Sequence, residues 1–330
     1  MVAARKKRRA HRNPGLTRIS GVKQRRRRLG IKTNLPRWVA YLKGNRLSPV
    51  AWVTVLADTQ REGLRRCRGL TRLRRSYRHW VTILLLPFVG LSYLLVELSR
   101  SKLSLLLVLI SLLWFTVVAR YCASQLSLVK PPGSQIPLQR FRLPNALTLG
   151  RLLLLPLMAT GILVKDQNPD LALIWFHFFL ALAATDVLDG FLARRLGLCT
   201  DWGRMADHTT DVLFGAMTAL ALWLAGALPS WFCFLVLLRF ALPPLGGSWL
   251  YLREVDQRIE PTIIGKATVL ALAALGGAFL YPRLLPKVEL VRSVLLDFTA
   301  AMVLLNIAYL FFKAHKLTHA QNGEGPTILS

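Results

Sequence analysis

Long apolar stretches separated by short polar connections dominate the chain from residue 80 onward. Each stretch is close to the roughly 20 residues that a helix needs to cross about 30 Å of hydrocarbon. Backbone polar groups cannot stay unpaired in lipid, and the alternating polarity of barrel strands is missing, so we expect these stretches to be helices. The pattern predicts eight transmembrane helices, at about Trp80–Leu98, Leu103–Ala119, Leu147–Val164, Leu171–Leu192, Val212–Leu228, Trp231–Leu252, Ile263–Tyr281 and Val291–Phe312.

Composition supports this reading and largely excludes a soluble enzyme. Of the 330 residues, 53% are hydrophobic and only 18% are charged, and the mean hydropathy is +0.41. The four cysteines are scattered and form no CxxC pair. Neither a disulfide framework nor a zinc site is therefore predicted.

The positive charge is concentrated in the first quarter of the chain. Residues 1–79 hold 24 Lys and Arg against two acids, and so carry +22 of the formal +28. We expect segment 1–34 to be a disordered basic arm that contacts anionic lipids or sets the orientation. Nucleic acid is the less favoured partner, because no aromatic residue suited to stacking precedes Trp38. Segment 35–79 mixes apolar residues with arginines, as in helices that lie in the membrane interface or pack as a short cytosolic pair on the membrane body.

The connections between the predicted spans indicate the orientation. If the basic arm is cytosolic, the connections richest in Lys and Arg also fall on the cytosolic side, and both termini lie there. We expect an integral protein of a bacterial inner membrane or its equivalent. The proline-containing segment 120–140 is interpreted as a cytosolic linker between two helices in 80–119 and a six-helix body in 141–313, with a tail in 314–330.

Four aspartates in the fourth and fifth predicted helices form the main candidate site. A charge inside a membrane helix costs about 2.5 to 3.5 kcal/mol on insertion scales, so each calls for a function. The spacing places one group of residues on a single stripe of the fourth helix: Asp186, Asp189, Gly190, Ala193 and Arg194. A second group lies on a single stripe of the fifth helix: Gly203, Asp207 and Asp211. A polar turn joins the helices, so the acidic stripes of this antiparallel hairpin can face each other.

Four converging carboxylates require a counter-charge. Mg²⁺ and Mn²⁺ are suited because they prefer oxygen ligands, and no histidine or cysteine cluster competes. Two metals could clamp a pyrophosphate and stabilise a leaving phosphate. The small residues Gly190, Ala193 and Gly203 would let a bulky ligand approach the helix backbone.

The whole string resembles the signature of the CDP-alcohol phosphatidyltransferases, with eight fixed positions over 26 residues. The resemblance extends over about Phe141–Lys313. It implies a homodimer of six-helix protomers that uses Mg²⁺ or Mn²⁺. By motif position, Asp186, Asp189 and Asp207 would bind metal, and Asp211 would share the second metal and act as the general base.

The same resemblance implies how the substrates are held. Gly190, Ala193, Arg194 and Gly203 would border the CDP moiety, with Arg194 paired to phosphate. The acceptor hydroxyl would attack the phosphorus next to the lipid, and CMP would leave.

Two further segments resemble family motifs. Leu143–Arg151 resembles the entry to the first helix of the body, where Asn145 and Thr148 would contact the nucleotide; helix capping and a snorkelling arginine are the alternative. Gly265–Thr268 resembles the family's Gly-Lys-x-x-Thr motif at the start of the fifth helix of the body. Arg239 lies in the middle of the predicted span before it. The candidates for binding an acceptor phosphate are Arg239, Lys266, Arg204, Arg253, Arg258 and Arg151.

These features favour an enzyme that transfers a phosphatidyl group from CDP-diacylglycerol to an alcohol, with glycerol 3-phosphate as the first choice. Phosphatidylglycerol, which would make the protein a cardiolipin synthase, and inositol phosphate are the alternatives. A transporter with an intramembrane acidic site would show metal-independent flux and would leave the motif glycines unexplained. A tethering protein that depends on its basic arm is a third possibility.

Overall fold

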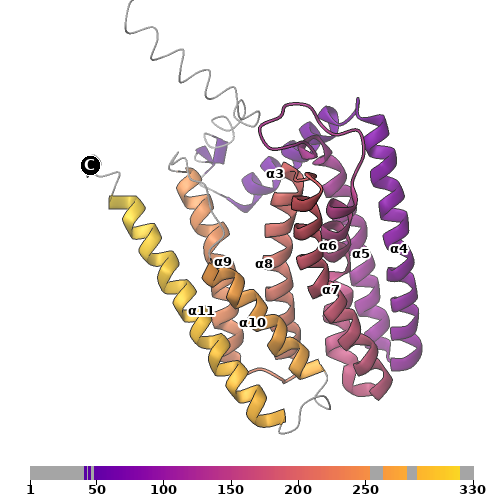
Figure 1. The fold of residues 1–330 in the computed structure, drawn as a ribbon, viewed down its shortest axis with the longest axis vertical. Coiled ribbons are helices and arrows are strands. Elements are labelled where there is room, and N and C mark those ends of the chain that lie inside the picture. Colours follow the sequence, from indigo (N-terminus) through magenta and orange to yellow (C-terminus); the bar gives the residue numbers. More distant parts are fainter. Residues whose placement is uncertain (1–40, 43, 46–47, 253–262, 281–287, 320–330) are drawn as a thin grey trace, which may run out of the picture.

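The computed structural model of the chain describes residues 41–42, 44–45, 48–252, 263–280 and 288–319. Within these ranges the regular structure is entirely helical, with long helices aligned side by side (Figure 1). The expected all-α architecture is confirmed, and the protein is an integral membrane protein. The predicted arm 1–34, Arg253 and Arg258 lie outside the described residues.

Each predicted span corresponds to one helix. In chain order these are α4 (Thr71–Ser99), α5 (Lys102–Ser124), α6 (Leu143–Val164), α7 (Pro169–Arg195), α8 (Asp201–Leu224), α9 (Ser230–Leu252), α10 (Ile263–Leu280) and α11 (Val288–His319). Two begin well before their apolar stretch, because polar residues form their first turns: α4 begins at Thr71 and α8 at Asp201. Helix α11 continues past the expected boundary at 313.

Among the described residues, α4, α5, α6, α7 and α11 are long and apolar enough to cross a membrane. Helices α9 and α10 contain shorter apolar segments. Helix α8 does not meet this criterion, and it carries Asp207 and Asp211 of the motif. The helix that carries two of the motif aspartates is therefore less uniformly apolar than these five spans.

Helix α6 is the centre of the molecule. Its most apolar window is 78% buried, against 11 to 22% for the other four spans of that class. It packs against α7 and α8, and also against α5 and α4. Its core residues include Leu149, Leu153, Leu155 and Met158. On the far side, α11 packs against α9 and α10, and α8 links the two groups of helices (Figure 1).

The two helices before the six-helix body are attached to α6 by side-chain hydrogen bonds to its backbone and to the backbone two residues before it begins. The indole Nε1 of Trp114 on α5 donates to the carbonyl of Leu152 at 3.0 Å. The indole Nε1 of Trp80 on α4 donates to the carbonyl of Phe141 at 2.9 Å. The outer faces of α4 and α5 expose leucines such as Leu86 and Leu113, as expected for surfaces in lipid.

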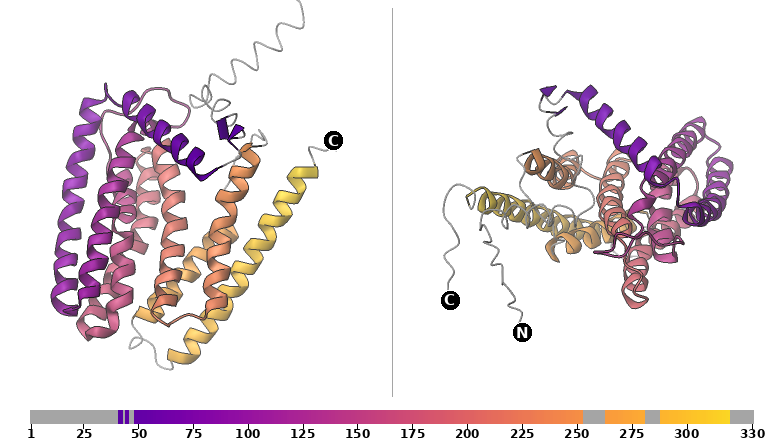
Figure 2. Two further views of the ribbon diagram at one scale, coloured as in Figure 1. Left: turned by 180° about the vertical axis from the view of Figure 1, so that it is seen from behind. Right: turned by 90° about the horizontal axis from the view of Figure 1, so that it is seen from above.

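A shorter amphipathic helix, α3 (Pro49–Arg66), crosses the end of the bundle that carries the motif hairpin (Figures 1 and 2). Its C-terminal end packs on α5 and on the short 3₁₀ helix η1 (Leu126–Leu128). Its N-terminal half exposes Val50, Val53 and Leu56. One end of α3 is therefore packed on the body, and the other presents apolar side chains outward.

Candidate active site

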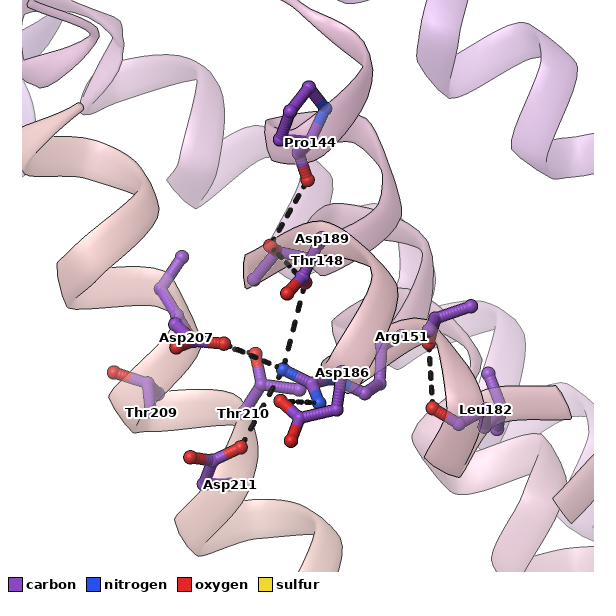
Figure 3. Close-up of polar contacts among 12 residues, drawn as sticks. Pro144, Thr148, Arg151, Leu182, Asp186, Asp189, Asp207, Thr209, Thr210 and Asp211 are labelled. Atoms are coloured by element: carbon purple, nitrogen blue, oxygen red, sulfur yellow. Dashed lines mark hydrogen bonds and ion pairs between the residues drawn. The ribbon is translucent and has the colours of Figure 1, made fainter. Parts of the chain in front are cut away.

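The motif hairpin is formed by the end of α7 and the start of α8. After α7, Gly197 adopts a positive φ of 63° that glycine tolerates without strain. Thr200 then caps α8, because its hydroxyl accepts a hydrogen bond from the backbone N–H of Gly203 at 2.9 Å. This turn brings the acidic stripes of the two helices together, as the spacing predicts (Figure 3).

Three of the four motif carboxylates converge. Asp186, Asp207 and Asp211 each offer one oxygen, and these three atoms lie within 4.8 Å of one another. Their side chains are 34 to 44% exposed, so the group faces an open side of the bundle. Asp189 lies deeper, is buried, and accepts a 2.6 Å hydrogen bond from the hydroxyl of Thr148 on α6.

A guanidinium lies among these carboxylates. Arg151 of α6 is only 3% exposed and forms an ion pair with Asp186. Its Nη2 atom lies 2.9 Å from an oxygen of Asp207, 3.6 Å from one of Asp211 and 3.9 Å from one of Asp189 (Figure 3). One arginine therefore contacts acids from both helices of the hairpin.

The donor set fits a hard divalent cation. All the converging ligand atoms are carboxylate oxygens, which Mg²⁺ and Mn²⁺ prefer, and no histidine or cysteine belongs to the group. With four carboxylates and one guanidinium the cluster has a formal charge of −3, so the arginine alone does not neutralise it. The three converging carboxylates are positioned to hold such an ion.

A second network joins α6 to the start of α8. The Thr200 hydroxyl donates to the side-chain oxygen of Asn145 at 3.0 Å, deep in the protein. A Cβ atom on Gly203 would lie 2.8 Å from that Asn145 oxygen and 3.1 Å from the Thr200 hydroxyl. The close approach of α8 to α6 therefore requires a glycine at position 203, independently of any role of this residue in binding a ligand. Among the described residues, the side-chain nitrogen of Asn145 is buried without a hydrogen-bond partner.

The other motif residues lie beside the carboxylates on α7. A Cβ on Gly190 would lie 3.2 Å from a guanidinium nitrogen of Arg194, whose side chain is exposed. Ala193 is half-buried. The guanidinium of Arg194 thus lies over the surface at Gly190, next to the open side of the site.

The predicted acceptor-binding cations are spread over several helices. Arg204 on α8 is exposed and its guanidinium lies 4.0 Å from Asp201. Arg239 on α9 is buried and lies over the ring of Phe240, with 4.2 Å to the ring centroid. Lys266 lies on α10, but its side chain is outside the described part of the structure, as is Arg253.

Two contributions were not predicted from the sequence. The sequence suggests only phosphate binding or snorkelling for Arg151, whereas its guanidinium contacts all four aspartates. The second contribution is that of Thr200, which links the α8 cap to α6. A signal was available, because Asn145, Thr148 and Arg151 recur every third residue on an otherwise apolar helix, and so form a polar stripe that must face a polar partner.

Comparison with known proteins identifies the family to which the chain belongs. The profile described as CDP-alcohol phosphatidyltransferase matches residues 141–312, just over half of the chain. The chain belongs to the CDP-alcohol phosphatidyltransferase family. It is therefore a transferase, and the resemblance recognised in the motif is confirmed.

Individual proteins from other organisms are similar to part of this chain, over segments of 86 to 150 residues. A protein of Aquifex aeolicus named CDP-diacylglycerol–glycerol-3-phosphate 3-phosphatidyltransferase is 35% identical over 129 residues, which are 38% of this chain and 68% of the relative. A Bacillus subtilis protein of the same name is 29% identical over 41% of this chain and 76% of the relative. A rice protein named cardiolipin synthase (CMP-forming) is 36% identical over 86 residues, 26% of each chain.

Proposed function

We propose that this protein transfers the phosphatidyl group of CDP-diacylglycerol to glycerol 3-phosphate, and so forms phosphatidylglycerol phosphate and releases CMP. The observation that carries the choice of acceptor is the similarity to the Aquifex and Bacillus relatives, both of which are named for this reaction. The motif end of the bundle also offers cations for a phosphorylated acceptor. Arg204 is exposed and follows the α8 cap, and Arg239 is buried on α9, which packs against α8.

We assign the divalent ions to the carboxylates. Asp186, Asp207 and Asp211 offer converging oxygens, and Asp189 joins them from its deeper position. Mg²⁺ or Mn²⁺ bound there would polarise the phosphorus and stabilise the departing CMP. Asp211 acts as the general base on the acceptor hydroxyl, and its side chain, which is 34% exposed, leaves room for that hydroxyl to approach.

The nucleotide is assigned to the surface of α7 beside the carboxylates. Gly190 and Ala193 present little side chain there, and the exposed Arg194 guanidinium can pair with a phosphate. Asn145 retains a buried amide donor among the described contacts, which is the type of group that a phosphate or ribose oxygen would accept from. Thr148 would act through Asp189, which it orients.

The acceptor is tested with a panel of alcohols. The purified protein, CDP-diacylglycerol and Mn²⁺ are incubated with glycerol 3-phosphate, phosphatidylglycerol, inositol, inositol phosphate or serine, and the lipid products are identified by mass. Phosphatidylglycerol phosphate should form faster than any other product. A faster reaction with another alcohol would refute the acceptor, and full activity in EDTA would refute the metal requirement.

Cardiolipin synthesis is the second candidate. It is favoured by the rice relative, which is 36% identical, although over only 86 residues. In the same panel it predicts cardiolipin from phosphatidylglycerol and no reaction with glycerol 3-phosphate.

We further propose that the motif end faces the cytosol, where CDP-lipid headgroups and a phosphorylated acceptor would be reached, and that both termini lie on that side. Helix α3, whose basic residues include Arg61, Arg65 and Arg66, also lies at this end of the bundle. The basic arm would contact anionic lipids in the same leaflet. A homodimer is the assembly expected for the family.

A further inference from the structure

The side chain of Arg151 occupies the place where the carboxylates of the hairpin meet. Among the described residues, its two terminal nitrogens pair with all four motif aspartates: one pairs with Asp186, and the other lies 2.9 to 3.9 Å from Asp207, Asp211 and Asp189. The residue comes from α6, so the contact crosses from the central helix to both helices of the hairpin (Figure 3).

The guanidinium is held by these carboxylates and by little else. Its Nε atom is buried without a hydrogen-bond partner among the described residues. A guanidinium fixed for purely structural reasons usually uses its full fork of donors. The position of the Arg151 guanidinium therefore depends on its ion pairs with these carboxylates, and a cation that neutralised the carboxylates would weaken those ion pairs.

A divalent ion bound by these acids would compete with this guanidinium for the same carboxylates. The converging oxygens of Asp186, Asp207 and Asp211 lie within 4.8 Å of one another, and Arg151 pairs with or lies near each of these three acids. Two cations a few ångströms apart in a half-buried site repel each other strongly. The three acids are partly exposed, so a displaced guanidinium has an open side toward which it can move.

We propose that Arg151 is a resident counter-ion: it holds the carboxylates of the two helices together without metal, and a divalent ion displaces its guanidinium on binding. Arg151 is thus a positioning residue that pre-assembles the site and at the same time lowers its apparent metal affinity. The inference rests on the divalent-ion site proposed above, but not on the choice of acceptor.

The test is a Mn²⁺ titration of the purified full-length protein without nucleotide or acceptor, with free Mn²⁺ followed by electron paramagnetic resonance. Arg151→Gln removes the competing charge and should bind Mn²⁺ about tenfold more tightly than the wild type, which corresponds to about 1.4 kcal/mol. Arg151→Lys keeps a cation with fewer donors and should fall between the two. Arg61→Gln makes the same charge change on exposed α3 and should leave the dissociation constant unchanged.

Thermal unfolding supplies a second measurement on the same proteins. Without metal, Arg151→Gln should unfold at a lower temperature than the wild type, because its carboxylates repel each other, and Mn²⁺ should raise its midpoint by more. Equal or weaker Mn²⁺ binding by Arg151→Gln, with the wild type binding normally, would overturn the displacement. No Mn²⁺ binding by the wild type would instead overturn the metal site itself.

A measurement on the wild type alone covers the case in which the glutamine variant does not fold. Experimental structures determined with and without Mn²⁺ should show the terminal nitrogens of Arg151 within 4 Å of Asp186 and Asp207 only in the metal-free protein. Retention of both pairs beside a bound ion would overturn the proposal.

Discussion

Replacing Gly203 by alanine tests whether this motif glycine is required by helix packing. The added methyl group would lie 2.8 Å from the Asn145 side-chain oxygen and 3.1 Å from the Thr200 hydroxyl, both closer than ordinary contact. Neither oxygen can retreat freely, since Thr200 donates to Asn145 and also caps α8 at Gly203. The start of α8 must therefore move away from α6, or this network must break.

The expected loss can be worked from these contacts. Overpacking a tight contact costs about 1 to 3 kcal/mol, and losing a buried hydrogen bond costs about 0.5 to 1.5 kcal/mol. Alanine regains at most about 1 kcal/mol of helix propensity. Gly203→Ala should therefore lose about 1 to 3 kcal/mol of stability, measured as a lower thermal midpoint of the purified protein in detergent.

Two other glycines provide matched controls. On α4, Gly90 has no atom within 4 Å of the position of an added Cβ, so Gly90→Ala should be neutral or slightly stabilising. In Gly190→Ala the nearest atom is the end of the flexible, exposed Arg194 side chain, which can move aside. That variant should keep its midpoint and lose turnover if nucleotide binds there. A midpoint of Gly203→Ala equal to that of Gly90→Ala would refute the packing argument.

Three further substitutions test the cap, the base and the core. Thr200→Val removes the acceptor for the Gly203 N–H and should lower stability by about 1 kcal/mol, whereas Thr200→Ser should restore the midpoint. Asp211→Asn should reduce CMP release at least about 100-fold while nucleotide binding persists; near-normal turnover would refute its role as base. Gly161→Ala on α6 would place a methyl group inside the indole ring of buried Trp175 and should prevent normal folding, seen as loss of the monodisperse peak in size-exclusion chromatography.

The helices and the acidic stripes could be predicted because both depend on local spacing. Leaving backbone polar groups unpaired in lipid is costly, so apolar stretches mark the spans, although α8 does not meet the hydropathy criterion over its length. Residues three and four apart share a helix face, so the positions of Asp207 and Asp211 on one stripe follow from their numbers. Helix ends were predicted less well, since the polar first turns of α4 and α8 carry no hydropathy signal.

Contacts between helices distant in sequence could not be obtained in this way. Spacing shows that Asp186 and Asp189 share a face, but it does not show that Arg151 of α6 points between them. That placement depends on α6 being the central helix, with α7 and α8 packed on it, and this is a property of the assembled bundle. The sequence indicates that the four carboxylates need a counter-charge, but it does not reveal Arg151, the cation that the protein itself supplies.

The central position of α6 also changes how the first two spans are understood. The family profile begins at residue 141, which suggests an appended pair of helices joined by a linker. In the structure Trp114 of α5 bonds to the α6 backbone at Leu152, one residue from Arg151. Trp80 of α4 bonds at Phe141, just before α6 begins. The helices outside the family profile therefore buttress the back of the same helix that presents Arg151 to the carboxylates at its front, so the boundary in sequence similarity is not a boundary in packing.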